Sequence, residues 1–370
     1  MRPPPLIVAF AAFGMVWGGW QAALPDLARH YALGTGPLGV ILTAGFALAL
    51  PVMLLSGRGL DRTGVRLGIG IPAGAMVVAL LLVAALPPLP VLVAAIVLLA
   101  VASGPYDVAI NATGMGHPIW SRPARLTLLH ASFSAGGAIG AIGAGSLIGS
   151  GLEFRLVHPL LATALLLAVV VVTRAPWAAA APSGSVPHRL AVAMVPLAIL
   201  AGLAFLAEGS METWSAIYLR DELGAGAFVG ALGPAAFHAA MLGGRLVGAG
   251  VAGTLGAPAT LLASGTAMVV GMSLALGLPA PVVAIPGMAL AALGAAFIVP
   301  VVVSLAARRA GVHAGRAASY VLTLGYAGFL VGPSLVGILG ELFGLRVALL
   351  VVPLAALVVV AASRSRVARG

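Results

Sequence analysis

The sequence predicts an all-α polytopic membrane protein with twelve transmembrane helices in two six-helix pseudo-repeats. Three observations predict this fold class: a very apolar composition, apolar runs that recur along the whole chain, and residues shared by the two halves at a fixed offset. Of the 370 residues, 61% are hydrophobic and only 8% are charged, whereas a soluble domain carries about 25% charged residues. The composition therefore excludes soluble enzymes, secreted domains and disordered chains.

The apolar runs are long enough to cross a bilayer, since a membrane-spanning helix needs about 20 apolar residues. The predicted spans cover residues 6–28, 37–56, 67–86, 90–112, 128–150, 157–173, 191–219, 226–248, 258–277, 281–306, 317–340 and 346–361. The first run is too long for a signal peptide and lacks a convincing cleavage site, so we expect it to remain as a helix. The connections are too short to hold a soluble domain.

The basic residues predict the orientation of the chain. All 19 basic residues are arginine, against 9 acidic residues, which gives a net charge of +10. Arg29, Arg155, Arg220 and Arg346 lie on one side of the predicted membrane, and the other fifteen, Arg245 among them, lie on the side of both termini. Because arginine-rich short loops stay inside, we expect a multi-pass protein of the inner (plasma) membrane with both termini cytoplasmic.

Other partners and prosthetic groups are not expected from the composition. No basic cluster with interleaved aromatic residues indicates nucleic-acid binding. The chain has no cysteine, which excludes disulfides and thiolate metal sites. The histidines show no metal-ligand spacing. We therefore expect no metal and no cofactor, and we expect a monomer whose partners are the lipid bilayer, a small-molecule substrate and protons.

An internal repeat divides the chain at its longest polar connection, Arg174 to Arg189. An offset of 191 residues superposes three pairs of arginines: Arg29 on Arg220, Arg125 on Arg316, and Arg155 on Arg346. We therefore expect an N-terminal six-helix half over residues 1–173, a cytoplasmic linker over 174–190 and a C-terminal half over 191–370. Two parallel halves with a substrate site at mid-depth between them are a known transporter architecture.

The connection between the second and third spans carries a motif, Gly57-Arg58-Gly59-Leu60-Asp61-Arg62-Thr63-Gly64-Val65-Arg66. Its glycine, Asp-Arg pair, second glycine and basic residue resemble the signature loop of the major facilitator superfamily, and the resemblance extends over the whole chain. It implies that Gly57, Asp61, Arg62, Gly64 and Arg66 form a gate that latches one conformation. A carboxylate near a helix N-terminus also gains from the helix dipole. The alternative is that these arginines only anchor the topology.

Two further segments are similar to a bacterial subgroup near fucose permease. They are His130-Ala131-Ser132-Phe133-Ser134 and Gly325-Tyr326-Ala327-Gly328-Phe329-Leu330-Val331-Gly332-Pro333. This finer resemblance implies proton-driven movement of a small organic solute, sugars being one class.

The acidic residues inside the predicted spans are candidates for proton coupling, because an ionisable group at mid-bilayer is costly. Glu208 and Glu212 lie one turn apart on the seventh span, and Glu208 is about 18 Å from its outer end at 1.5 Å per residue. A carboxylic acid at this depth suits proton uptake from one side and release to the other. The alternative is that Glu208 is a permanently neutral packing residue.

A second polar group is predicted on the fourth and fifth spans, where Asp107, Asn111 and His130 occur. Asp107 and His130 are at similar distances from the connection near Pro118, so a proton relay and a static polar clamp are both open. His238 is midway along the eighth span, where a substrate contact competes with an ordinary hydrogen-bonded packing role.

The remaining substrate candidates are large or polar residues at mid-depth. The repeat aligns Trp17 with Glu208 and Gln21 with Glu212. Aromatic residues are scarce at 6%, so Phe297 and Tyr326 are included as walls of a binding site. The full set of substrate-binding candidates is Trp17, Gln21, Asn111, His238, Phe297 and Tyr326.

The sequence thus predicts a secondary active transporter that moves a small polar solute by alternating access, as a proton-coupled symporter. The alternatives are a proton-coupled exporter of drugs or amphiphilic metabolites and, more remotely, a receptor or scaffold that does not transport. The glycine-rich fifth span resembles that of drug/proton antiporters but lacks their proline. An enzyme is not expected, because no nucleophile–base or metal constellation is present.

Overall fold

The computed structural model describes residues 5–116, 123–175, 177 and 188–368. These described residues form helices and no strand. They divide into two compact units by their internal packing, residues 1–182 with 226–235 and residues 183–225 with 236–370. The two units are described separately below.

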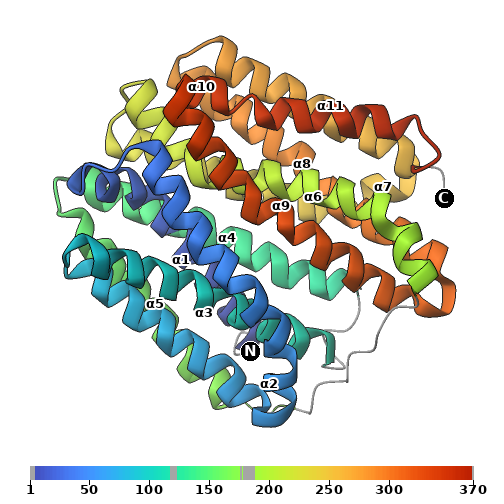
Figure 1. Cartoon of the computed structure of the whole chain (residues 1–370), viewed down its shortest axis with the longest axis horizontal. Coiled ribbons are helices and arrows are strands. Elements are labelled where there is room, and N and C mark those ends of the chain that lie inside the picture. The colour runs from blue at the N-terminus through green and yellow to red at the C-terminus, as the bar shows by residue number, and fades with distance from the viewer. Residues whose placement is uncertain (1–4, 117–122, 176, 178–187, 369–370) are drawn as a thin grey trace. The chain divides into compact units, whose positions relative to one another are not determined.

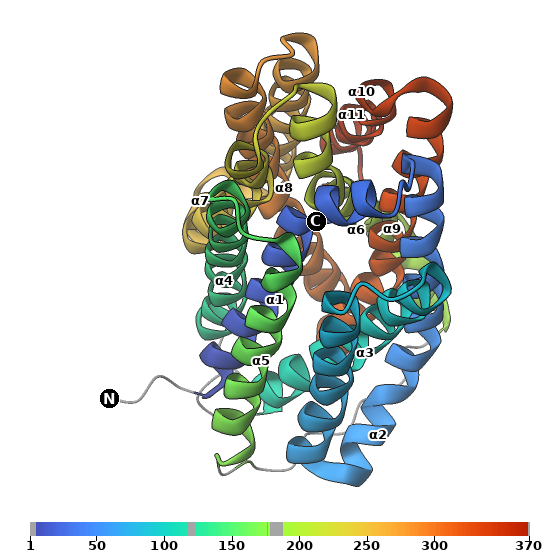
Figure 2. The ribbon, with the colours of Figure 1, turned by 90° about the vertical axis from the view of Figure 1, so that its left-hand side faces the viewer.

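The first unit is built from α1 to α5, with a short 3-10 helix before α5. The helices are α1 (Pro5–His30), α2 (Thr35–Ala84), α3 (Leu89–Gly116), α4 (Pro123–Gly149) and α5 (Val157–Thr173). The main packing pairs are α1 with α4 and α2 with α3, and Figure 2 shows α2 and α3 side by side. Glycine makes the first pair possible, because a Cβ at Gly18 would collide with the carbonyl oxygen of Gly137.

The second unit repeats this plan. Its helices are α6 (His188–Ile217), which a π-helical turn extends to Glu222, α7 (Ala227–Gly277), α8 (Pro281–Ala310), α9 (Ala314–Phe343), α10 (Leu345–Ala348) and α11 (Val351–Ser363). Here α6 packs mainly against α9, as the neighbouring ribbons in Figure 1 show. A Cβ at Gly328 of α9 would collide with the carbonyl oxygen of Gly202 of α6.

Backbone geometry confirms the two-repeat prediction. α2 breaks at Gly64, whose φ is 75°, and α7 breaks at Gly256, whose φ is 73°. These two glycines are 192 residues apart, close to the sequence offset. Left-handed φ values favour glycine because it has no Cβ, so each break marks the place where one span ends and the next begins.

The twelve predicted spans are confirmed. Twelve helical segments among the described residues are long and apolar enough to cross a membrane. The largest differences from the prediction lie at the connections after the second and eighth spans, which the sequence placed at residues 57–66 and 249–257. The sequence indicated loops here, whereas the helices continue almost to Gly64 and Gly256 on both sides.

The break at Gly64 also places Asp61 within the fold. Asp61 precedes Gly64 and therefore lies in the last turn of the segment that begins at Thr35, not in the first turn of the next one. A carboxylate at a helix C-terminus gains nothing from the helix dipole. Asp61 therefore gains nothing from the dipole of its own helix, and its gating role stays a prediction.

Candidate functional site

Two acidic side chains are buried on α6 of the second unit. Glu208 and Glu212 are each only 6% exposed, and one helical turn separates them, so they share a face. α6 is held in place by its close packing with α9, where a Cβ at Gly209 would lie 3.0 Å from the carbonyl oxygen of Phe329. The sequence prediction that both acids lie inside a span agrees with the span Ala191–Glu222.

α7 places two basic side chains beside these acids. Nε2 of His238 lies 3.3 Å from Oε1 of Glu212, and the His238 side chain is 1% exposed. Arg245 follows two helical turns later on the same face. Its guanidinium interacts electrostatically with Glu208, Glu212 and Tyr326. The four ionisable side chains Glu208, Glu212, His238 and Arg245 are called the charged cluster below.

α9 and α8 add aromatic groups to the same unit. The ring of Tyr326 stacks on that of Phe205, with centroids 5.0 Å apart and planes 24° from parallel. Phe297 of α8 lies against α7, since a Cβ at Gly248 would be 3.3 Å from its Cδ1. Two of the predicted substrate residues therefore lie close to the charged cluster. Tyr326 interacts with Arg245, and Phe297 lies beside Gly248, one helical turn after Arg245.

Arg245 is the functional candidate that sequence reasoning missed. It was counted among the arginines that orient the chain, yet it lies inside the span Ala227–Gly248. The sequence could have indicated this role, because Arg245 falls inside the predicted eighth span and lies two helical turns from His238 on the same face. With two carboxylates and one guanidinium, a single added proton makes the cluster electrically neutral when His238 is neutral.

The first unit places uncharged groups at the equivalent positions of α1. The ring of Trp17 stacks on Phe46 of α2, with centroids 6.1 Å apart, and meets Phe13 edge-on at 6.4 Å. Gln21 is 4% exposed, and its Oε1 accepts no hydrogen bond from the described residues. An aromatic face and an open acceptor, one turn apart, suit a ring that carries a hydrogen-bond donor.

Asp107 and His130 have different surroundings. Asn111 donates from Nδ2 to Oδ1 of Asp107 at 2.9 Å, within α3. His130 of α4 meets Phe10 of α1 edge-on, with centroids 5.4 Å apart. α3 packs mainly on α2, and α4 packs mainly on α1. The proton relay between Asp107 and His130 stays a prediction.

The predicted gating residues are only partly described. The backbone of the motif is helical up to Gly64, and the side chains of Arg62 and Arg66 are exposed. The surroundings of Gly57 and the side chain of Asp61 are not among the described parts of the structure. The latch therefore stays a prediction. For metals, the described part of the chain contains no group of three or more histidine, aspartate or glutamate residues able to hold an ion.

Comparisons with known protein sequences agree on one family. The family model of the major facilitator superfamily matches residues 6–326. Membrane protein MosC of Rhizobium meliloti is 31% identical, over 96% of this chain and 88% of that protein. An uncharacterised MFS-type transporter of Yersinia pestis is 29% identical, over 97% of this chain and 94% of that protein.

Solved structures show the same fold at low sequence identity. The nucleoside transporter NupG has a TM-score of 0.75 at 14% identity and covers 97% of this chain and 97% of its own. A bacterial homologue of the human lysosomal transporter Spinster has a TM-score of 0.76 at 14% identity, with 99% and 96% covered. FucP has a TM-score of 0.65 at 15% identity, with 98% and 99% covered. These likenesses concern the fold alone.

Proposed function

Because the chain belongs to the major facilitator superfamily, whose members carry out secondary transport by alternating access, we propose that it is a proton-coupled symporter of a small polar solute. It would work in the inner membrane with both termini cytoplasmic, as the arginine distribution favours, and as a monomer. The observation that carries proton coupling is the charged cluster within the membrane-spanning part of the second unit.

The charge balance of the cluster supports this proposal. Ionisable groups inside a membrane persist where they pair with one another or serve a pathway. Glu208 interacts electrostatically with Glu212 on its own helix and with Arg245 on α7, while Nε2 of His238 lies 3.3 Å from Oε1 of Glu212. A proton on Glu208 neutralises the excess carboxylate, and release of that proton restores a negative charge beside Arg245.

The solute class is proposed from the first unit. Trp17 and Phe46 offer an aromatic surface, and Gln21 and Asn111 offer amide groups on α1 and α3. Such a set suits a solute with a flat or sugar-like ring and hydroxyl or amide donors. His238, Phe297 and Tyr326 are proposed as contacts in the second unit, and Asp107 and His130 as secondary sites of protonation.

The test begins with a ligand found by thermal shift, because a solute that binds only the folded state raises the melting temperature. Purified protein is screened against sugars, nucleosides and organic acids, and the hit is used for uptake into proteoliposomes. An imposed pH gradient should drive accumulation in the wild type and, to a reduced degree, in Asp107→Asn, whose acid is only a secondary site. Glu208→Gln should exchange solute across the membrane without accumulating it. Full pH-driven accumulation by Glu208→Gln would overturn the coupling proposal.

A further inference from the structure

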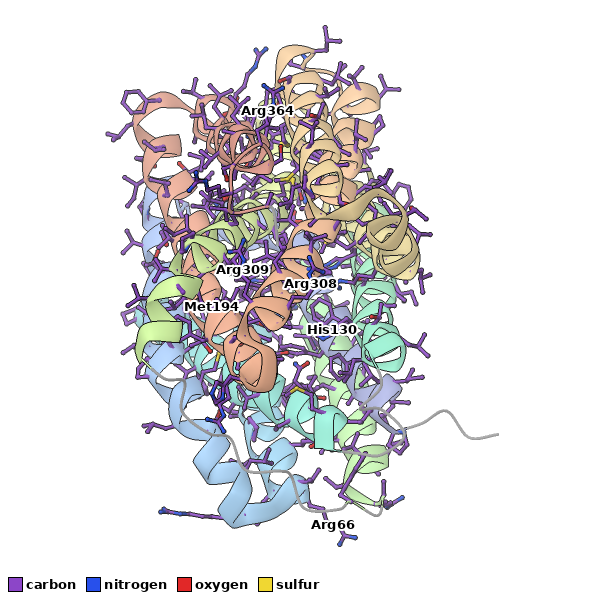
Figure 3. The ribbon with its side chains drawn as sticks, turned by 90° about the vertical axis from the view of Figure 1, so that its right-hand side faces the viewer. Arg66, His130, Met194, Arg308, Arg309 and Arg364 are labelled. Carbon is purple, nitrogen blue, oxygen red and sulfur yellow. The ribbon has the colours of Figure 1, made fainter. Side chains whose placement is uncertain are left out.

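Five arginines gather at one end of the second unit, where α8 ends, α9 begins and α11 ends. They are Arg308, Arg309, Arg316, Arg364 and Arg366, and all five side chains are exposed. This group is called the basic end below. Figure 3 labels three of its members, Arg308, Arg309 and Arg364, on the face turned towards the viewer. These arginines lie in the last or first turn of a membrane span or just beyond one, so the basic end lies at a membrane surface.

Hydrogen bonds join the end of α8 to the chain that follows α11. Arg309 donates from Nη2 to the carbonyl oxygens of Arg366 and Val367, at 3.2 and 2.8 Å. The chain after α11 is therefore folded back onto the end of α8. Nη1 of Arg308 donates to Oγ of Ser304 at 2.9 Å, which directs Arg308 along its own helix. Arg309 organises the basic end, while Arg308, Arg364 and Arg366 present their charge at its surface.

The second unit carries no acidic residue near this end. Its five acids are Glu208, Glu212, Asp221, Glu222 and Glu341. Two belong to the buried cluster, and two follow the opposite end of α6. Glu341 is separated from Arg316 by nearly the whole of α9, a distance of about 37 Å along a helix. No acidic side chain of this unit therefore lies near the basic end.

The opposite end of the same unit does carry acidic residues close to its arginines. Arg220 is followed directly by Asp221 and Glu222. Arg346 donates from Nε to the carbonyl oxygen of Leu276 at 2.6 Å, so its guanidinium has a structural role. Three acids of the unit, Asp221, Glu222 and Glu341, therefore lie towards this end, whereas none lies near the basic end.

We propose that the basic end is a docking surface for anionic phospholipid headgroups, with phosphatidylglycerol as the occupant. Phosphate at the bilayer surface is the anion within reach of residues that directly flank membrane spans. Guanidinium groups pair with phosphate through two parallel hydrogen bonds, which suits arginine better than lysine. The proposal does not rest on the transported solute or on proton coupling.

The test measures the melting temperature of the detergent-purified full chain during titration with short-chain lipids. Wild-type protein should be stabilised at a lower concentration of phosphatidylglycerol than of phosphatidylcholine, and added salt should reduce the difference. The variant Arg308→Gln/Arg364→Gln/Arg366→Gln keeps the structural Arg309. It should require on the order of one hundredfold more phosphatidylglycerol for the same shift, because each arginine contributes about a fivefold gain in affinity.

A matched control removes three arginines at the opposite membrane surface, Arg29→Gln/Arg155→Gln/Arg220→Gln. It loses the same net charge and should keep the wild-type response to phosphatidylglycerol. Three outcomes would overturn the proposal: equal responses of the wild type to both lipids, an unchanged response in the basic-end variant, or an equal loss in the control. Stabilisation by inorganic phosphate at the same concentration would also overturn it, because a free anion would then be the occupant.

Discussion

The first helices of the two units occupy the same place in the repeat and carry different chemistry. α1 and α6 each pack against the fourth long helix of their own unit through glycine. At two equivalent positions α1 has Trp17 and Gln21, whereas α6 has Glu208 and Glu212. The packing is duplicated, but the buried charge is concentrated in the second unit.

The two units share their helix packing but not their buried charge, and the two features have different requirements. Close helix contacts depend on small residues along a whole face, so both units keep them. A buried carboxylate instead needs particular partners, and those partners, His238 and Arg245, are on α7 of the second unit. We infer that the first unit provides solute contacts and the second provides the proton site, and the predictions below test this division.

The largest effect is expected from Arg245→Gln. Without the guanidinium, two buried carboxylates lose the nearby cation, and leaving a buried charge uncompensated costs about 3–5 kcal/mol of unfolding free energy. Chemical denaturation in detergent measures the loss. The exposed Arg308→Gln is the control and should change stability by less than about 0.5 kcal/mol. Equal stability of Arg245→Gln and Arg308→Gln would show that the cluster needs no cation.

The next effect comes from moving a carboxylate into the first unit with Gln21→Glu. Gln21 is 4% exposed and no arginine equivalent to Arg245 is expected there, since residue 54 in the repeat is a leucine. An unpaired acid inside a span costs about 3 kcal/mol, and the loss should shrink at low pH as the acid is protonated. Gln21→Leu is the control for lost amide contacts. A pH-independent loss in Gln21→Glu would contradict the charge argument.

A smaller effect is expected where glycine brings the helices together. Gly18→Ala introduces a Cβ that collides with the carbonyl oxygen of Gly137, whereas a Cβ at the equivalent Gly209 lies 3.0 Å from that of Phe329. Overpacking costs about 1–3 kcal/mol, so Gly18→Ala should destabilise more than Gly209→Ala in thermal unfolding. A larger loss of stability in Gly209→Ala than in Gly18→Ala would contradict this ranking by Cβ distance.

The smallest effect is expected at two tyrosines, one in each unit, whose hydroxyls donate to backbone carbonyl oxygens. The hydroxyl of Tyr218 donates to the carbonyl oxygen of Ala275 at 3.0 Å in a buried site. That of Tyr31 donates to Pro87 at 2.6 Å in a partly buried one. Tyr218→Phe should cost about 1 kcal/mol, and Tyr31→Phe should cost less because water can replace the lost donor. Equal losses in thermal unfolding would contradict this role of burial.

Much of the fold could be predicted from the sequence, because a backbone that crosses the hydrocarbon core must satisfy its own hydrogen bonds. Apolar runs of sufficient length become helices whatever their tertiary contacts, so the twelve spans were predictable. Their ends were less predictable near Gly64 and Gly256, where a single left-handed residue separates two helices. Composition alone suggested longer loops there.

The site was predictable to a smaller degree. Glu208 and Glu212 stood out because acids are rare inside spans. The pairing of Glu212 with His238 depends on how α6 meets α7, which periodicity does not specify. Arg245 was missed because an arginine near a span end is usually a topological anchor. Its electrostatic interaction with the two acids becomes visible only when the helices are packed.

The central claim is that a carboxylic acid in the second unit carries the proton. Infrared difference spectroscopy of the purified protein during a pH titration tests it directly, because a protonated carboxyl group has its own carbonyl band and no solute is required. The account predicts a titrating band that Glu208→Gln removes and that Asp107→Asn leaves in place. A band that survives in Glu208→Gln and disappears in Asp107→Asn would assign the proton to the first unit and contradict the account.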